Sequence, residues 1–326
     1  MLTRRRFSGL LAAAPLAAPA LAQDRFAALI AEVEALDQFR CLVVAQDGAE
    51  VLAHTVRGGG PDAPANIKSV SKSVVSALLG AAIAREVVPG VEATLAEVAR
   101  DLIPADADPR VADITLEDLV TLRAGLERTS GANYGAWVSS PNWVADALGR
   151  EMVADPGSRF LYSTGTTHVL GAALAEASGE TLLTLARRWL AEPLGIEIPA
   201  WTRDPQGYYL GGNDMALTPR AMLAFGEMYR AGGGDVLPAD WIEASWTPRT
   251  RSPFSRHQYG YGWFLAQARG HRVAYARGYG GQMIYVVPDL ALTVAITSDP
   301  TRPARSGGYG GVLNRLLADT IIPAIA

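Results

Sequence analysis

Two lysines, Lys68 and Lys72, lie four residues apart, and all the other residues among the 29 basic side chains are arginines. Lysine differs from arginine because burial can remove its proton near neutral pH, and the neutral amine is then a base. Lys72 follows Ser69 by three residues, the spacing of a Ser-x-x-Lys motif, in which the amine activates the serine hydroxyl as a nucleophile. Chance placement is the alternative explanation. We expect Lys68 to face a different side of the chain and to tolerate arginine.

The residues around this motif predict a buried helix. Residues 70–85 are apolar nearly all round, which is typical of a helix inside a core. Ser69 and Lys72 would then lie on the same side of its first turn, with the positive end of the helix near the serine oxygen. Ser71 and Ser73 are rival nucleophiles, but neither has a lysine three residues later. The pattern therefore favours Ser69 as the nucleophile and Lys72 as its base.

Composition excludes several classes of function. Of the 326 residues, 49% are hydrophobic and 19% charged, which is typical of a globular chain. The net charge of −4, with arginines scattered along the chain, provides no basic stripe for nucleic acid. The four histidines are dispersed and show no metal-ligand spacing, so we expect neither a metal nor a cofactor. The single cysteine, Cys41, lies in an apolar run and is expected to be a buried small hydrophobe.

Residues 1–22 have the features of a twin-arginine signal peptide. Residues 3–7 fit the twin-arginine pattern, an apolar stretch begins at Gly9, and the small residues at 20–22 suit a cleavage site. We expect a bacterial protein that uses the Tat export machinery, begins at Gln23 when mature, and is periplasmic or secreted. A cytoplasmic protein with an unusual N-terminus is the alternative. No apolar segment is long enough for a stable membrane span.

Strands are predicted near both ends of the chain and helices between them. A helix is expected at 24–37, followed by strands at 41–45 and 50–55 that Asp47 and Gly48 join as a hairpin. Further strands are expected at 262–267, 272–276, 282–287 and 290–297, and a final helix at about 312–322. The short turns predict an antiparallel sheet of the α+β class, with a helical region inserted.

The middle of the chain carries several helix boundaries. Thr115 and Asp118 fit a capping box, Gly179 is a suitable residue to end the helix predicted from 165, and Thr218 with Pro219 opens another helix. No internal repeat or linker separates these elements. We therefore expect one domain at 23–326, with a sheet lobe at roughly 23–68 and 250–326 and a helical lobe at roughly 86–249.

Three motifs resemble those of one family. The motifs are Ser69 to Lys72, the segment 156–164 (Pro-Gly-Ser-Arg-Phe-Leu-Tyr-Ser-Thr) and the segment 278–282 (Gly-Tyr-Gly-Gly-Gln). Their order resembles that found in the class C β-lactamase, penicillin-binding protein and carboxylesterase group of serine hydrolases. Weaker similarity at 114–126, 213–228 and 259–264 extends the resemblance over most of 38–325. The resemblance implies a β-lactamase/transpeptidase-like fold: an antiparallel sheet flanked by helices, an all-helical lobe, and the site between them.

The resemblance also implies catalytic roles. Ser69 would be the nucleophile, Lys72 its base partner, and Tyr162 the hydroxyl that transfers protons to the leaving group. The alternative for Tyr162 is an ordinary packed aromatic residue.

The third motif is expected to bind the substrate. The backbone N–H groups of Ser69 and Gln282 would form the oxyanion hole, and Gly280 and Gly281 would allow a substrate to approach the strand closely. The alternative for the two glycines is a bulge or a turn.

Two residues depart from the family pattern. Thr164 stands where the family usually has asparagine, and Tyr279 replaces the lysine of Lys-Thr-Gly, which helps to hold the carboxylate of penicillins and D-Ala-D-Ala peptides. Arg277 is two residues away on the same strand face and could substitute for that lysine. These departures favour neutral esters or amides over β-lactams.

We therefore predict a secreted serine hydrolase that cleaves small ester, amide or peptide-like substrates through an acyl-enzyme on Ser69. A β-lactamase or D-alanyl-D-alanine carboxypeptidase is one alternative, and a catalytically silent penicillin-binding-like protein is another. An α/β-hydrolase is excluded, because the sequence has no Gly-x-Ser-x-Gly motif. Substrate identity depends on loops such as 130–141 and 201–210, which sequence patterns do not resolve.

Overall fold

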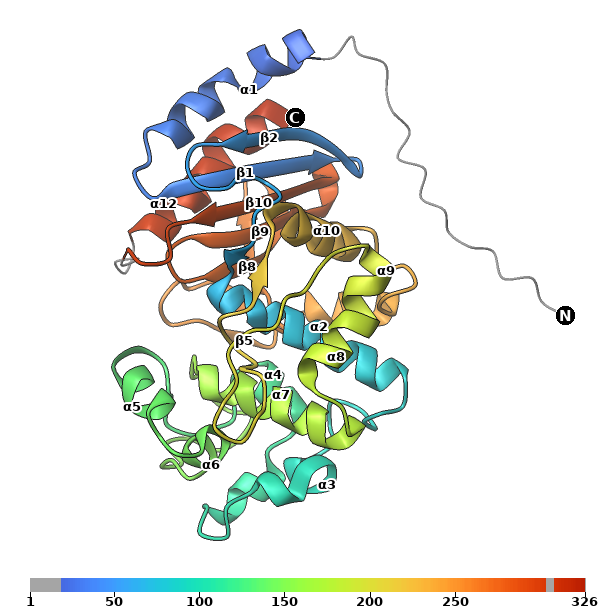
Figure 1. Cartoon of the computed structure of the whole chain (residues 1–326), viewed down its shortest axis with the longest axis vertical. Coiled ribbons are helices and arrows are strands. Elements are labelled where there is room, and N and C mark those ends of the chain that lie inside the picture. The colour runs from blue at the N-terminus through green and yellow to red at the C-terminus, as the bar shows by residue number, and fades with distance from the viewer. Residues whose placement is uncertain (1–18, 303–307, 326) are drawn as a thin grey trace, which may run out of the picture.

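The computed structural model describes residues 19–302 and 308–325, so the expected signal peptide lies outside the described residues up to residue 18. Helix α1 (Pro19–Glu34) includes most of the helix predicted at 24–37 and begins before the expected cleavage site. The described residues form a sheet lobe and a helical lobe, with helix α2 (Ser71–Ala84) between them (Figure 1). The start of α2 is therefore placed where the two lobes meet.

The sheet lobe is built on an eight-stranded antiparallel sheet with the order β2-β1-β10-β9-β8-β7-β6-β5. The first hairpin pairs with a late strand through β1 and β10, as the sequence predicted. A separate two-stranded sheet pairs β3 (Ala65–Asn66) with β4 (Ala216–Leu217). The large sheet comprises β1 (Phe39–Gln46), β2 (Ala49–Thr55), β5 (Thr250–Arg251), β6 (Gln258–Tyr259), β7 (Phe264–Ala268), β8 (His271–Gly278), β9 (Gln282–Val287) and β10 (Leu292–Ser298).

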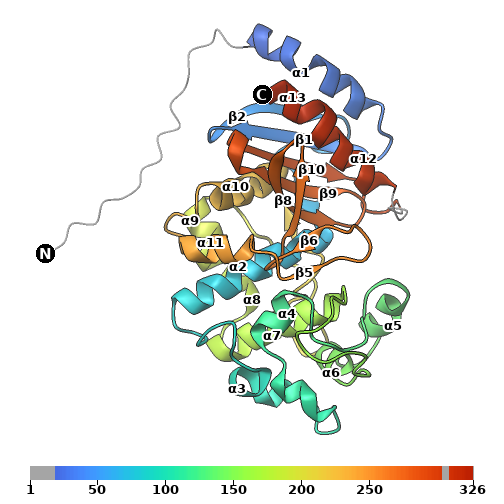
Figure 2. The same cartoon turned by 180° about the vertical axis from the view of Figure 1, so that it is seen from behind.

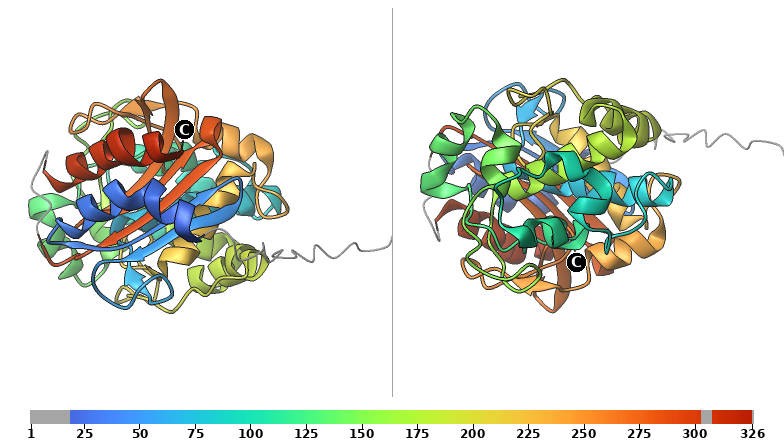
Figure 3. Two further views of the ribbon diagram at one scale, coloured as in Figure 1. Left: turned by 90° about the horizontal axis from the view of Figure 1, so that it is seen from above. Right: turned by 90° about the horizontal axis from the view of Figure 1, so that it is seen from below.

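Alternate residues of the central strands enter two different cores, one on each face of the sheet. In β1, Val43 packs into the core shared with α2, whereas Leu42 and Val44 pack into the core beneath α1. Figure 3 shows α1 beside α12 (Tyr309–Leu316) and α13 (Ile322–Ile325) on that outer face. Because both faces are covered, the central strands are apolar along their whole length. The expected burial of Cys41 is confirmed, since 2% of it is exposed.

Helix α10 (Pro219–Arg230) packs on the inner face of the sheet rather than in the helical lobe. A Cβ at Gly226 would lie 2.7 Å from Thr293 and 2.8 Å from Ile284, both on sheet strands, so a larger residue would push the helix off the sheet. This placement corrects the helical lobe expected at 86–249, because 219–230 belong to the sheet layer. Figure 2 shows α10 against the sheet, and α11 (Ala239–Ser245) packs on α2, where a Cβ at Gly80 would lie 2.5 Å from the Trp241 ring.

The helical lobe is assembled from short helices around α7 (Thr164–Ser178). The predicted capping box at Thr115 and Asp118 is confirmed, and so is the end of α7 at Gly179, whose φ of 68° suits glycine. Its other helices are α3 (Leu95–Ala99), α4 (Leu116–Val120), α5 (Tyr134–Val138), α6 (Trp143–Leu148), α8 (Leu182–Ala186) and α9 (Glu192–Leu194).

Short 3-10 and π turns connect several of these elements. The 3-10 turns are Lys68–Val70, Arg100–Leu102, Pro109–Asp113, Gly131–Asn133 and Pro288–Leu290, and the π turns are Arg187–Ala191 and Leu317–Ile321. Among the described residues, no single helix is long and apolar enough to cross a membrane. In that part of the chain, one pair of segments, α7 with Leu182–Leu194, meets the test of length and composition when taken together, and this pair is bent by 86°.

Candidate active site

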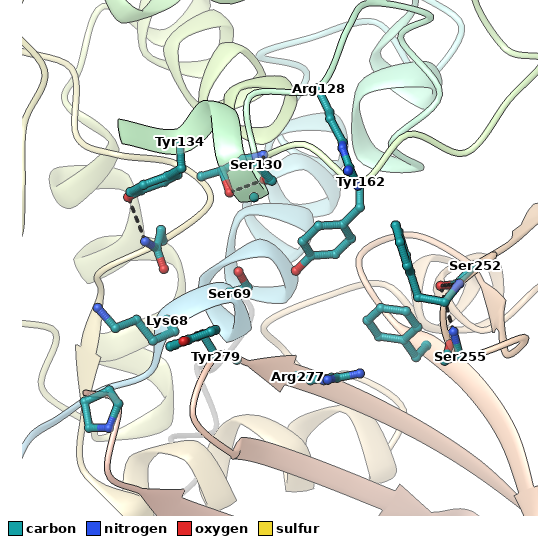
Figure 4. A pocket seen from close by; sticks show the side chains of 17 residues that line it. Lys68, Ser69, Arg128, Ser130, Tyr134, Tyr162, Ser252, Ser255, Arg277 and Tyr279 are labelled. Carbon is teal, nitrogen blue, oxygen red and sulfur yellow. Dashed lines mark hydrogen bonds between the residues drawn. The ribbon is translucent and has the colours of Figure 1, made fainter. Parts of the chain in front are cut away.

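The turn before α2 brings Ser69 into a cavity between the lobes. The cavity has a volume of about 680 Å³, and Ser69 lines it (Figure 4). The rival serines are buried and donate to backbone carbonyls: Ser71 Oγ to Lys68 O at 2.6 Å, and Ser73 Oγ to Gly262 O at 2.6 Å. Of the three serines near the lysines, Ser69 is therefore the one placed to meet a substrate.

Lys72 lies beneath Ser69 in a buried polar pocket. Its Nζ is 3.4 Å from Ser69 Oγ, 3.3 Å from Thr164 Oγ1 and 2.6 Å from Gly212 O. Burial lowers the pKa of the Lys72 ammonium to about 7, so a large fraction of the side chain is neutral amine at neutral pH. This is the protonation state that a base requires.

The contacts of Lys72 allow its lone pair to face Ser69. A carbonyl oxygen only accepts hydrogen bonds, so one N–H of the neutral amine points at Gly212. The Thr164 hydroxyl, which is 3.0 Å from Ser130 Oγ, can accept the second N–H. The lone pair then faces the Ser69 hydroxyl. Because catalytic hydrogen bonds are often long before substrate binds, the 3.4 Å separation is compatible with proton transfer.

Tyr162 completes this group. The Lys72 ammonium lies 5.1 Å from the centre of its ring, and Figure 4 shows its hydroxyl directed toward Ser69. Burial raises the pKa of the Tyr162 hydroxyl, an effect partly offset by hydrogen bonding to Ser69 and by the positive charge of Arg277. Tyr162 is therefore a neutral hydroxyl at pH 7, whereas Lys72 is close to its pKa. Such a separation of pKa values is typical of a pair in which one group accepts a proton and the other donates one.

The charged residues that line the cavity are all cations. Lys68, Arg128 and Arg277 contribute to its wall, and no aspartate or glutamate does so among the described residues. Lys68 forms an ion pair of 2.9 Å with Asp214, whereas neither arginine has a carboxylate within ion-pair distance in the described part of the chain. Lys68 lines the cavity and pairs with Asp214, whereas the Lys72 nitrogen is buried beside Gly212, which agrees with the expectation that the two lysines face different sides.

An aromatic wall faces these cations. Phe264 stacks on Tyr162 with ring centres 6.5 Å apart, and Arg128 lies over the ring of Phe254 at 5.6 Å. The lining residues are Lys68, Ser69, Arg128, Ser130, Gly131, Tyr134, Tyr162, Thr164, Asn213, Ser252, Phe254, Ser255, Phe264, Arg277, Gly278, Tyr279 and Pro300.

The third motif is positioned differently from the expectation. Gln282 is fully buried, pairs with Gly278 in the β8–β9 ladder, and clamps β10 by donating from Nε2 to Ser298 O at 2.8 Å. It is not among the lining residues described above, so its expected place in an oxyanion hole is not supported. The end of β8 meets the nucleophile turn instead, because a Cβ at Gly278 would lie 2.3 Å from Ile67 O.

Gly280 and Gly281 form the turn between β8 and β9. Their φ values are 78° and 96°, which favour glycine, and a Cβ at Gly281 would lie 2.3 Å from the Tyr309 ring. A Cβ at Gly280 would lie 2.7 Å from Asp299 O. The expected approach of a substrate to this pair is therefore wrong, and the turn that was the alternative explains both glycines.

Three other predicted residues do reach the cavity. Thr164 contacts the base itself, rather than presenting an amide to the substrate as asparagine would. Tyr279 lines the cavity wall and is 50% exposed, and Arg277 extends from the same strand end. Gly212 was missed by sequence reasoning, because it contributes a backbone carbonyl that no residue type reveals.

Comparison with known proteins concerns the sequence family and the fold. The sequence model of the family described as Beta-lactamase matches residues 27–319. Among solved structures, EstCE1, a hydrolase with promiscuous acyltransferase activity, superposes with a TM-score of 0.76 and 19% identity over 94% of this chain and 99% of the other. The octameric penicillin-binding protein homologue from Pyrococcus abyssi gives 0.71 and 18%, over 93% of this chain and 77% of the other.

A variant of simvastatin synthase from Aspergillus terreus gives a TM-score of 0.69 and 16% identity, over 93% of this chain and 96% of the other. A search of curated protein sequences found no significant match. The similarity to the solved structures confirms the β-lactamase/transpeptidase-like fold that the sequence predicted.

Proposed function

Because the chain belongs to the β-lactamase family, we propose that it is a serine hydrolase that cleaves small ester or amide bonds through an acyl-enzyme on Ser69. The observation that carries the proposal is the contact set of Lys72. Burial lowers the pKa of its ammonium to about 7, and with hydrogen bonds donated to Gly212 O and Thr164 Oγ1 the lone pair is free to face Ser69. A lysine kept only as a positive charge would be expected to contact a carboxylate, and Lys72 has none among its contacts in the described part of the chain.

The proposed acylation step uses each group once. Lys72 accepts the proton of Ser69 as Oγ attacks the substrate carbonyl carbon and the carbonyl oxygen becomes an oxyanion. The oxyanion collapses, the bond to the leaving group breaks, and Tyr162 donates its proton to the departing oxygen or nitrogen. The proton held by Lys72 then restores the tyrosine hydroxyl. Water attacks the acyl-enzyme in the reverse sense and releases the acid.

Two backbone N–H groups would stabilise the oxyanion. Ser69 supplies one, at the N-terminal end of the helical segment that continues as α2. For the other we propose Tyr279 in place of Gln282. The support is that Tyr279 lines the cavity and follows Gly278, whose missing side chain lets β8 approach the nucleophile turn.

A β-lactamase or carboxypeptidase activity is the second candidate. Substrates of those enzymes carry a carboxylate, and Arg277 contributes a cation to the cavity with no carboxylate partner among the described residues. A guanidinium could hold such a group through two parallel hydrogen bonds. Neutral esters need no such anchor, so the two candidates differ in their dependence on Arg277.

The proposal is tested with a fluorophosphonate probe and a set of p-nitrophenyl esters, short amides and nitrocefin on one preparation. We expect the wild-type protein to be labelled and to release p-nitrophenol. Ser69→Ala should abolish both signals, whereas Ser71→Ala and Ser73→Ala should remain labelled. Labelling that survives in Ser69→Ala and disappears in Ser73→Ala would reassign the nucleophile. Folded wild-type protein that reacts with neither the probe nor any ester would be the catalytically silent alternative.

A further inference from the structure

Residues 211–215, which precede β4, are bonded at five successive positions to parts of the chain around the active site. The contacts come from three helices, α2, α5 and α7, and from the nucleophile turn. They are Gly211 N to His168 Nδ1 at 3.3 Å, Lys72 Nζ to Gly212 O at 2.6 Å, Asn213 Nδ2 to the Tyr134 hydroxyl at 2.9 Å, Lys68 Nζ to Asp214 Oδ1 at 2.9 Å, and Met215 N to Ser71 Oγ at 3.3 Å.

Both lysines of the chain therefore contact this one segment, from either side of Ser69. Lys72 meets the carbonyl of Gly212, and Lys68 meets the carboxylate of Asp214 two residues later. The mechanism above uses Lys72 and leaves Lys68 without a role. Because the two contacts are only two residues apart, a shift at Asp214 would also move the carbonyl that orients the catalytic amine.

Lys68 is held in an unusual backbone conformation. Its φ is 50° and that of Asp214 is 65°, both in the left-handed region, which costs a non-glycine residue on the order of 1–2 kcal/mol. Side chains compensate for this strain. Lys68 N donates to Asn66 Oδ1 at 2.9 Å, and Asn66 Nδ2 donates at 3.0 Å to Asp214 Oδ1, the oxygen that Lys68 also contacts. The ion pair thus closes a ring of contacts around the residue before the nucleophile.

We propose that the Lys68–Asp214 ion pair is a latch that fixes the nucleophile turn against residues 211–215, which makes Lys68 and Asp214 positioning residues for the hydrolysis proposed above. The latch sets two geometries together: the left-handed turn that directs Ser69 into the cavity, and the Gly212 carbonyl that directs the lone pair of Lys72. About a quarter of each side chain is exposed, at 23% and 25%, so the ion pair is partly shielded from solvent.

The test measures the rate constant of fluorophosphonate labelling, with kcat and KM for a p-nitrophenyl ester. Lys68→Met and Asp214→Ala should each lower the labelling rate constant and kcat on the order of 10–100-fold, the size expected from a small misplacement of reacting groups. KM should change less than about threefold, because the pair orients the reacting groups and does not grip the substrate. Lys68→Arg, which keeps the charge, should recover most of the rate.

The double variant Lys68→Met with Asp214→Ala should be no slower than the slower single variant, because both changes break one contact. The control is the exposed Arg188–Glu180 ion pair at 2.7 Å, where Arg188→Met and Glu180→Gln should leave the rates within about twofold. Asp214→Asn removes the charge while keeping the shape, and it supplies the comparison if the alanine variant does not fold.

Rates in Lys68→Met and Asp214→Asn within twofold of wild type would overturn the inference. So would effects that multiply in the double variant, or a loss confined to KM, which would make Lys68 a substrate-binding residue. Wild-type protein that is not labelled at all would instead overturn the proposed function, and this inference with it. Labelled wild type with unaffected variants would overturn the latch alone.

Discussion

The floor and the rim of the cavity are held in different ways. At the floor, Lys72 is 3% exposed and its nitrogen is fixed by contacts to three oxygen atoms from three parts of the chain. At the rim, Phe254 is 68% exposed and Tyr279 is 50% exposed. The difference indicates that the reaction depends on the residues at the floor, which tolerate little movement. The choice of substrate depends on the residues at the rim, which tolerate substitution.

The two lobes meet across the rim through a weak contact. Arg128 comes from the helical lobe and Phe254 from the loop between β5 and β6, and the guanidinium carbon lies 5.6 Å from the ring centre. An exposed cation–π contact contributes about 0.5–1 kcal/mol, so thermal motion separates the two side chains readily. We expect substitutions at the floor of the cavity to lower kcat and substitutions at the rim to change KM and substrate preference.

The largest effect is expected at the floor of the cavity. Lys72→Arg should be nearly as damaging as Lys72→Ala, with a loss on the order of 10²–10⁴ in kcat/KM for a p-nitrophenyl ester, because arginine stays protonated and accepts no proton. Steady-state kinetics of the two variants measures this loss. If Lys72→Arg keeps most of its activity, the lysine supplies only positive charge and the base assignment is wrong.

The next effect concerns the strand end at the rim. Tyr279→Lys should raise kcat/KM for cephalosporins or peptide carboxylates by about tenfold to more than a hundredfold, because a charge-assisted hydrogen bond contributes roughly 1.5–3 kcal/mol. Neutral esters should change little, and parallel assays with nitrocefin and a p-nitrophenyl ester would show the contrast.

Arg277→Ala is the matched control for this prediction. If that change selectively removes turnover of an anionic substrate, Arg277 already serves as the anchor. Efficient wild-type hydrolysis of penicillin that Arg277→Ala leaves untouched would contradict the preference for neutral esters.

A smaller effect is expected from pH. The pKa of Lys72 is lowered by burial to about 7, and the neutral amine is the active form, so kcat/KM should rise with pH and level off above about 7. Below that pH, the rate should fall about tenfold per pH unit, as for a single essential base. A pH profile with an ester substrate measures the midpoint. Residual activity of Lys72→Ala should lack this acidic limb, and an unchanged limb in that variant would assign the titration to another group.

The smallest effect is expected from Phe254→Ala. Loss of an exposed ring and its contact with Arg128 should raise KM about two- to fivefold, which corresponds to about 0.5–1 kcal/mol, while kcat stays within about twofold. Michaelis–Menten kinetics with esters of increasing acyl length would measure both constants. A fall in kcat as large as that of Lys72→Ala would contradict the distinction between the rim and the floor of the cavity.

The sequence predicted the elements with strong local signals. The hairpin at Asp47 and Gly48 and the end of α7 at Gly179 both follow from residues that need particular backbone angles. The Ser-x-x-Lys spacing placed Ser69 and Lys72 on one side of a helical turn, because three residues make almost one turn.

Two expectations near the site failed, those for Gln282 and for the glycine pair, and other features were missed, all for reasons of tertiary structure. The approach of β8 to the nucleophile turn falls at Gly278, where β8 ends, whereas Gly280 and Gly281 form the turn that follows and Gln282 is the buried partner of Gly278 in the β8–β9 ladder. The left-handed backbone of Lys68 and its place on the cavity wall have no signal in the sequence. The carbonyl of Gly212 gives no signal at all in a sequence.

The pairing of β1 with β10 also determines the order in which the molecule folds. Phe39 is opposite Ser298 in that ladder, so the early hairpin has no partner on its inner edge until nearly all of the chain has been synthesised. Contacts of such large sequence separation slow folding, and an unpaired edge strand is a site for association with other chains. A truncation before β10 should therefore yield an aggregating product rather than a smaller folded domain, and a chaperone that covers the β1–β2 hairpin would be expected to improve the yield of soluble protein.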